Sequence, residues 1–164
     1  MNFYKGDMVM HWSRGIGQII NLEERALAGA NTTYYEVQVR DMTVWVPADS
    51  SAGSRMRYPT SKLRFESLLA ILSSPSEPLP ADRLERKARL LELLQDGRPE
   101  SLCRVLRDLS AYQIQLGKPM NENDQMVLKQ ARNTLLGEWG FVLSLTHAQA
   151  EIELYRLLEP AGSN

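Results

Sequence analysis

Few residues of the types that do covalent or metal chemistry occur in this 164-residue sequence, and they lie far apart. His11 and His147 are isolated, so each is expected at the surface or at a strand end, and no Cys, His and carboxylate cluster has metal-ligand spacing. The single cysteine, Cys103, follows Leu102 in a helical run and is expected to be a partly buried helix residue. No serine lies in a nucleophile context. We therefore expect no enzymatic activity, no cofactor and no metal ion.

Two glycines near the amino terminus, Gly15 and Gly17, raise the question of a phosphate-binding loop. Such a loop needs a lysine and a hydroxyl residue directly after its last glycine, followed by a helix. Gly17 is followed instead by a strand-like run that begins with Gln18 and Ile19. We therefore interpret both glycines as turn or bulge positions.

The charge of the chain is nearly balanced but unevenly placed. The formal net charge is −1, so the overall charge gives no argument for nucleic-acid binding. The stretch 81–132 is mildly basic with acidic residues among the basic ones, whereas the stretch after Asn133 is acidic. This pattern is typical of a solvated helix surface with many salt bridges. The alternative is a weak phosphate-contacting face.

The first 50 or so residues read as short β-strands separated by Gly, Asn and Asp turns. Apolar and polar residues alternate along the run 34–40, as in a half-buried strand. In the run 43–46, Val44 and Val46 share one face, which places Trp45 on the other. A Trp there either covers the sheet or anchors a partner, because interfaces are enriched in Trp. The pattern predicts a small antiparallel β-barrel.

Beyond residue 58 the apolar residues recur at every third or fourth position, which predicts helices. The Pro- and Ser-rich segment 73–80 is expected to be a semi-rigid spacer. A helix from about Ala81 to Leu94 follows it. The pattern predicts that this helix buries Leu84, Ala88, Leu91 and Leu94 and turns Arg83, Arg86 and Arg89 away from them.

Capping residues set the expected ends of the other helices. The first is expected to begin near Ser61, and the third runs from Pro99 to Gly117. Asn121 or Asn123 is expected to cap a long fourth helix. Thr146 and Gln149 have the spacing of a capping box for the last helix.

The change of period divides the chain into parts and predicts an α+β protein, a small barrel followed by an all-α bundle. The expected parts are a β domain at 1–58, a connecting helix and linker at 59–79, a helical domain at 80–159 and a tail at 160–164. The charges of Lys5 and Asp7 do not fit a signal peptide. No apolar run approaches the roughly twenty residues of a membrane span. We therefore expect a cytoplasmic protein without a membrane contact.

Several segments, taken in order, are similar to one known family. In the β part they are Lys5-Gly6-Asp7-Met8-Val9, Gly15-Ile16-Gly17, Glu23-Glu24-Arg25, Tyr34-Tyr35-Glu36-Val37 and the run from Met42 to Asp49. In the helical part they are Lys87-Ala88 with Leu91, Asp96-Gly97, the run from Val105 to Leu109 and the run from Leu128 to Glu138. Over nearly its whole length the chain resembles the CarD/CdnL family of bacterial transcription regulators, whose amino-terminal domain is shared with transcription-repair coupling factor.

The resemblance implies a non-enzymatic factor that docks a Tudor-like barrel on the lobe of the RNA polymerase β subunit and favours the open promoter complex. In the family the barrel pairs strand to strand with the lobe, so backbone bonds supply affinity and flanking side chains select the partner. Arg25 falls at a family polymerase-contact position, and Trp45 occupies one where many members carry arginine. These two residues are the predicted polymerase-binding pair.

The resemblance also implies a contact between the helical domain and promoter DNA. Many members place a tryptophan just before the second helix as a minor-groove wedge, but here Asp82 stands near that position. Lys87 matches a basic family position and forms, with Arg83 and Arg86, the predicted DNA-binding set. Because the wedge is missing, we expect DNA binding to be weak and non-specific.

Another basic family position in the fourth helix is Gln125 here, and Leu79 or Leu84 is the candidate for a weaker wedge. The alternative function is a protein-protein adaptor that binds polymerase or another partner through the barrel without productive DNA contact. A monomer is expected, with a strand-swapped dimer as the alternative.

Overall fold

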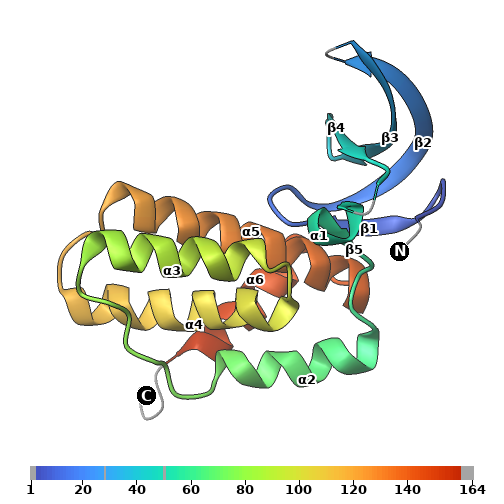
Figure 1. Cartoon of the computed structure of the whole chain (residues 1–164). Helices are drawn as coiled ribbons and strands as arrows, with labels where there is room; N and C mark the ends of the chain where they lie inside the picture. The colour runs from blue at the N-terminus through green and yellow to red at the C-terminus, as the bar shows by residue number, and fades with distance from the viewer. Residues whose placement is uncertain (1–2, 28, 50, 160–164) are drawn as a thin grey trace. The chain divides into compact units, whose positions relative to one another are not determined.

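The computed structural model describes residues 3–27, 29–49 and 51–159, and it separates into two compact units, residues 1–59 and 60–164. The first unit is built mainly of strands and the second of helices (Figure 1). The elements of the first unit are β1 (Met8–His11), β2 (Gly15–Leu27), β3 (Ala30–Val39), β4 (Met42–Pro47), α1 (Ala52–Arg55) and β5 (Met56–Arg57). Those of the second are α2 (Lys62–Leu72), α3 (Arg83–Gln95), α4 (Pro99–Leu116), α5 (Glu122–Leu143) and α6 (His147–Leu158).

The five strands form an antiparallel sheet in the order β4-β3-β2-β1-β5, and the predicted closure into a barrel is not observed. Figure 1 shows β2 and β3 as a long curved pair, but β4 pairs only with β3 and β5 only with β1 within the described residues. The edge strand β5 has two residues and directly follows the short helix α1. Neither α1 nor β5 was expected from the sequence.

The core of the β unit follows the alternation expected along its strands. Tyr35, Val37 and Val39 of β3 are buried, as is Val46 of β4. They pack with buried residues elsewhere in the unit, namely Phe3, Val9, Ile19, Ala52 and Met56. The backbone N–H of Phe3 donates to the hydroxyl of Tyr35 over 3.3 Å, which ties the start of the chain to this core.

The two glycines at the start of β2 have different structural roles. Gly15 has a φ of 87°, which confirms the prediction of a turn glycine. Gly17 lies within β2, opposite Val9, and the register shift of this strand falls elsewhere, between Ile19 and Asn21. A Cβ at Gly17 would lie 2.7 Å from Cγ2 of Val39 and 2.9 Å from the carbonyl oxygen of Gln38. The prediction of a turn or bulge was therefore wrong for Gly17, which allows two strands to approach closely.

The helical unit confirms the predicted helix ends. The side chain of Asn121 caps α5 by accepting from the N–H of Asp124 over 2.8 Å, and Gly117 ends α4 with a φ of 67°. Thr146 and Gln149 form the predicted capping box at the start of α6. These ends depend on hydrogen bonds within one turn of chain, which explains why the sequence predicts them.

The segment predicted as a spacer lies against α4. The backbone N–H of Glu77 donates to Asp108 over 2.9 Å, and Arg107 donates to the hydroxyl of Ser74 over 2.8 Å. Phe65, Leu68 and Leu72 place α2 in the same hydrophobic core as α3 to α6. The spacer therefore connects two helices of one unit. The predicted domain boundary between residues 79 and 80 stays a prediction.

Helix α3 is rotated relative to the sequence prediction. Its buried residues are Arg86, Leu90 and Leu94, whereas Leu84 and Leu91 are 68% and 44% exposed. Nε of Arg86 lies 3.0 Å from Oδ2 of Asp124, and both side chains are almost fully buried. Burial of Arg86 is thus compensated by a carboxylate, so the expectation that this arginine faces solvent was wrong.

Three further contacts complete the environment of Arg86. Its Nη1 donates to the carbonyl oxygens of Pro80 and Ala81 over 3.1 and 3.2 Å. Its guanidinium carbon lies 4.9 Å from the ring centroid of Tyr112 in α4. Arg86 therefore connects the start of α3 with α4 and α5.

Replacing Gly17 by alanine is expected to destabilise the β unit by about 1–3 kcal/mol, because the new methyl group overlaps Val39 and a backbone oxygen. Chemical denaturation followed by Trp fluorescence measures this change. Gly53→Ala is the matched control, since a Cβ there meets nothing within 4 Å and lies in a helix. Equal stability of the two variants would contradict the close approach at Gly17.

Replacing Arg86 by alanine is expected to destabilise the helical unit by about 3–5 kcal/mol, because it leaves Asp124 buried without its counter-charge. Thermal unfolding followed by circular dichroism tests this, with Arg83→Ala as the exposed control in the same helix. A loss below about 1 kcal/mol for Arg86→Ala would show that Arg86 reaches solvent.

Candidate functional site

The two residues predicted to bind polymerase lie together on one face of the sheet. Arg25 is in β2 and Trp45 is in the edge strand β4, yet the guanidinium carbon lies 4.3 Å from the ring centroid of Trp45. This distance is that of a cation–π contact. The side chain of Arg25 is exposed and that of Trp45 is half-buried, so both remain available to a partner.

The strand register explains how the pair forms across an intervening strand. Trp45 lies opposite Glu36 of β3, and Arg25 lies opposite Thr32 of the same strand. Residues two apart on a strand share a face, so positions 32 to 36 connect the two along one surface. The alternation of Val44 and Val46 with Trp45 predicted this face, but the contact itself depends on the pairing of three strands.

Strand β4 also offers unpaired backbone groups. Within the described residues its only strand neighbour is β3. The N–H and C=O groups of its other edge are therefore available to a further strand. Trp45 lies in this edge strand, and the guanidinium group of Arg25 reaches its ring across β3.

The outer face of α3 carries the other predicted contact residues, apart from Arg86. Leu84, Lys87, Ala88 and Leu91 recur with helical spacing and are all exposed, and Arg83 is exposed beside them. We call these five residues the outer α3 face. Of the two candidate wedge residues, Leu84 lies on this face, whereas Leu79 is half-buried against the core.

Asp82 has a structural role at the start of the outer α3 face. Its carboxylate accepts from the backbone N–H of Glu85 over 2.9 Å, so it is the N-cap of α3. A capping acid thus stands near the position where the family resemblance implies a wedge aromatic. Gln125 donates from its amide to the carbonyl oxygen of Met120, which leaves no cation at that position of α5.

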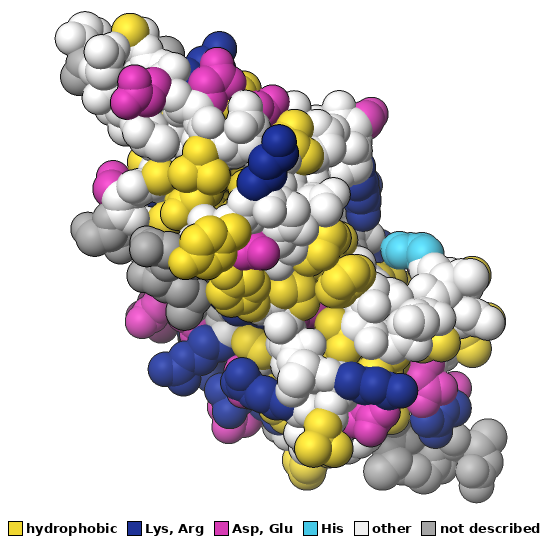
Figure 2. Space-filling view, turned by 90° about the vertical axis from the view of Figure 1, so that its right-hand side faces the viewer, with side chains coloured by type: hydrophobic (Ala, Val, Ile, Leu, Met, Phe, Trp, Pro, Cys, Tyr) yellow, Lys and Arg dark blue, Asp and Glu magenta, His cyan; other side chains and the backbone are white. Residues whose placement is uncertain are grey.

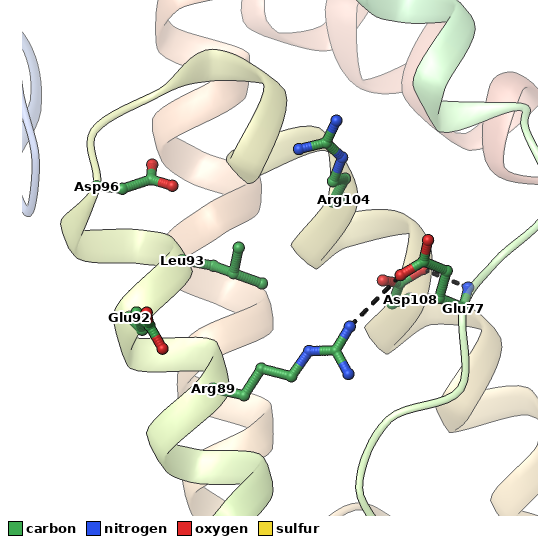
Figure 3. A pocket seen from close by; sticks show the side chains of 7 residues that line it. All are labelled: Glu77, Arg89, Glu92, Leu93, Asp96, Arg104 and Asp108. Atoms are coloured by element: carbon green, nitrogen blue, oxygen red, sulfur yellow. Dashed lines mark hydrogen bonds and ion pairs between the residues drawn. The ribbon is translucent and has the colours of Figure 1, made fainter.

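Charges of both signs surround the rest of the helical unit. Between α3, α4 and Glu77 lies a cavity of about 530 Å³, lined by Glu77, Arg89, Glu92, Leu93, Asp96, Arg104 and Asp108. Figure 3 shows Arg89 reaching across this cavity to Glu77, a pair whose N and O atoms lie 3.5 Å apart. Carboxylates outnumber guanidinium groups here, so this cavity does not favour phosphate. On the face drawn in Figure 2, acidic and basic side chains are likewise interspersed.

His11, His147 and Cys103 are the residues that the sequence offered for covalent or metal chemistry, and each lies apart from the others. His11 ends β1, where burial and then the charge of Arg14 lower its pKa to about 4, and its Nδ1 accepts from the N–H of Ser13. His147 is exposed beside Glu151. Cys103 is buried in α4, and desolvation followed by the charge of Glu138 raises its pKa to about 12. Within residues 3–159, apart from the two undescribed positions, no group of three metal-ligating side chains comes together.

Comparison with known proteins assigns both units. A family model described as the CarD-like/TRCF RID domain matches residues 3–58, and a second, the CarD C-terminal domain, matches residues 67–155. No curated protein matches the chain. Among the described helices, none has the length and apolar character needed to cross a membrane. The two family models match in sequence the β unit and the helical unit, so the chain belongs to the CarD family of RNA polymerase-interacting transcription regulators.

Proposed function

We propose that the β unit docks on the lobe of the RNA polymerase β subunit and that the outer α3 face contacts promoter DNA near the upstream edge of the open bubble. The protein then modulates the lifetime of the open complex. It does so by binding alone, without a cofactor or a reaction. The observation that carries this proposal is the contact between Arg25 and Trp45 beside the unpaired edge of β4.

The geometry of this contact supports docking through β4. A strand of the lobe that pairs with the free edge of β4 gains backbone hydrogen bonds that depend little on sequence. Trp45 and Arg25 supply the side-chain selectivity, because aromatic and arginine side chains contribute most of the energy of many interfaces. The cation–π contact holds the indole and the guanidinium in place before binding, which lowers the entropy lost on docking.

The DNA side of the proposal rests on three residues of the outer α3 face. Arg83 and Lys87 are exposed cations one helical turn apart, and Leu84 is an exposed apolar side chain between them. Cations contact phosphates, and an apolar side chain can enter a distorted base step. With two cations and one capping acid, we expect free DNA binding in the range of about 10⁻⁴ to 10⁻⁶ M, with a steep salt dependence.

A protein-protein adaptor without productive DNA contact is the second candidate function. The burial of Arg86 favours it, since one of the three predicted DNA-binding cations is used inside the bundle. Glu85 and Glu92 on α3 reduce the positive charge of the same helix further. In this case polymerase binding through β4 remains and promoter DNA is not contacted.

Arg25→Glu and Trp45→Ala are each expected to weaken binding to the full β subunit by an order of magnitude or more. Truncating a buried interface Trp or Arg commonly costs about 2 kcal/mol or more. Titration by biolayer interferometry measures the affinity, and thermal unfolding of each variant checks that the fold persists. The effect on open-complex lifetime should fall in parallel with the affinity.

Two exposed residues of the same unit serve as matched controls. Met42→Ala truncates a side chain of β4 on the face opposite Trp45, and Arg14→Glu reverses a charge away from the pair. Both controls should bind as the wild type does. If Trp45→Ala unfolds the unit while Arg25→Glu binds normally, the docking surface lies on another edge.

Lys87→Glu is expected to weaken binding to promoter DNA severalfold and to lower the slope of log affinity against log salt by about 1. Asp82→Asn should strengthen binding, because asparagine keeps the N-cap while the negative charge is removed. Fluorescence anisotropy at several salt concentrations measures both effects. Lys62→Glu, on α2, is the control for a charge reversal outside the outer α3 face. Unchanged anisotropy for both Lys87→Glu and Asp82→Asn, together with intact polymerase binding, would select the adaptor function.

A further inference from the structure

Glu36 lies in the middle of the sheet face that carries Trp45 and Arg25. It is directly opposite Trp45 of β4 on one side and opposite Asn21 of β2 on the other. Residues two apart along a strand share a face, so Glu23 lies on this face between Asn21 and Arg25. We call the face with Glu23, Arg25, Glu36 and Trp45 the docking face.

The carboxylate of Glu36 is half-buried and has no counter-charge. Within the part of the chain that the structure describes, Glu36 forms neither an ion pair nor a side-chain hydrogen bond. A carboxylate that is partly removed from water loses solvation, and a hydrogen-bonded cation is the group that best compensates for this loss. Glu36 is therefore suited to accept a cation from outside the chain.

Carboxylates outnumber cations on the docking face. In the stretches 21–25, 32–38 and 43–47 its charged residues are Glu23, Arg25 and Glu36, so two negative charges and one positive charge give a net charge of −1. The guanidinium carbon of Arg25 lies 4.3 Å from the ring centroid of Trp45, and among the described residues Arg25 pairs with neither carboxylate. Complementary charge across an interface selects the partner, so this face favours a basic one.

A strand paired with the free edge of β4 can bring a cation to Glu36. Such a strand lies two strand spacings from β3, or about 10 Å. Arg25 already spans the same number of strands, because it extends from β2 across β3 to the indole in β4. A lysine or arginine opposite Trp45 spans the distance in the same way, with its apolar stem along the indole and its charged group at Glu36.

We propose that Glu36 determines the specificity of docking, and that the docking face selects a partner strand with a lysine or arginine opposite Trp45. This inference rests on the proposed docking through β4 and names the chemistry of the surface that β4 meets. Arg25 then serves mainly to hold the indole, and Glu36 supplies the charge that the partner recognises.

An acidic partner strand, which would pair with Arg25, is the alternative. Its carboxylate would lie near Glu36 and Glu23, and like charges across an interface oppose binding. The face of the guanidinium that lies over the Trp45 ring is also unavailable to it. The net charge of the docking face and the contact of Arg25 thus both favour the basic partner.

The first experiment measures the affinity of the full chain for the β subunit by biolayer interferometry. Glu36→Gln is expected to weaken binding about tenfold, because the partner's cation loses its counter-charge. Glu36→Lys should weaken it further. The affinity of the wild type should fall as salt is raised, and Glu36→Gln should reduce this salt dependence.

Glu24→Gln is the matched control for the first experiment. It removes the same charge from an exposed position of β2, but Glu24 lies opposite Thr33 and so on the other face of the sheet. Its affinity should change by less than about twofold. Tighter binding of Glu36→Lys would show an acidic partner, and an unchanged affinity of Glu36→Gln would show that Glu36 makes no contact. Either result overturns the proposal.

Thermal unfolding of each variant checks that the β unit stays folded. Glu36→Gln is nearly isosteric with the native residue and replaces no core side chain, so it keeps the test valid if Glu36→Lys does not fold.

The second experiment needs no polymerase. The ¹⁵N-labelled full chain is titrated with acetyl-Thr-Val-Lys-Val-Thr-amide and with the same peptide carrying Glu in place of Lys. The lysine peptide should shift the amide resonances of β4 with an affinity about two- to fivefold higher than that of the glutamate peptide. Glu36→Gln should remove this preference. An equal response to the two peptides, including no response to either, would overturn the proposal.

The two proposals fail in different ways. If the wild type does not bind the β subunit, the proposed function is wrong, whereas the two peptides still decide which charge the docking face prefers. If the wild type binds the β subunit but Glu36→Gln binds equally well, docking stands and the role of Glu36 is wrong.

Discussion

The buried ion pair between Arg86 and Asp124 sets the arrangement on which the rest of the helical unit depends. It fixes the rotation of α3, because a guanidinium group inside the bundle must stay within reach of its carboxylate. The same guanidinium group also donates hydrogen bonds to the carbonyl oxygens of Pro80 and Ala81, which lie between the spacer and α3. Buried ion pairs often contribute less to stability than their geometry suggests, and this one constrains the orientation of α3. That orientation turns Leu84 and Leu91 to solvent and creates the outer α3 face.

Features that depend on local hydrogen bonds could be predicted from the sequence, and features that depend on distant partners could not. Asn121, Thr146 and Gln149 mark helix ends because their side chains bond to the backbone three residues away. The rotation of α3 escaped prediction, since residues 84, 88 and 91 are all apolar and fit one helix face, whereas the face of residues 86, 90 and 94 that is buried includes an arginine. Only Asp124, 38 positions away, makes the second face the buried one. The open sheet was missed for a similar reason, because α1 and the two residues of β5 carry no periodic signal.

For the predicted contact residues, too, local features could be predicted from the sequence and features that depend on distant partners could not. Alternation along β4 sufficed to place Trp45 on the face opposite Val44 and Val46, and the family resemblance added Arg25. Their contact needs the register of three strands and the irregularity between Ile19 and Asn21, which no single strand reveals. On α3, Arg83 and Lys87 are exposed, whereas Arg86 belongs to the interior. An arginine and an aspartate in separate helices give no sequence signal that they pair. Only the folded bundle shows that Arg86 is used inside the protein while Arg83 and Lys87 are exposed to solvent.

The environment of Cys103 has a practical consequence for following this molecule in solution. Its thiol is fully buried, and its pKa of about 12 leaves almost no thiolate at neutral pH, so alkylating reagents have neither access nor a nucleophile in the folded bundle. The sequence contains one cysteine, so no other thiol contributes a background signal. The rate at which Cys103 is labelled therefore reports how often the helical unit opens, and cysteines introduced at exposed positions can carry dyes without removing the native one.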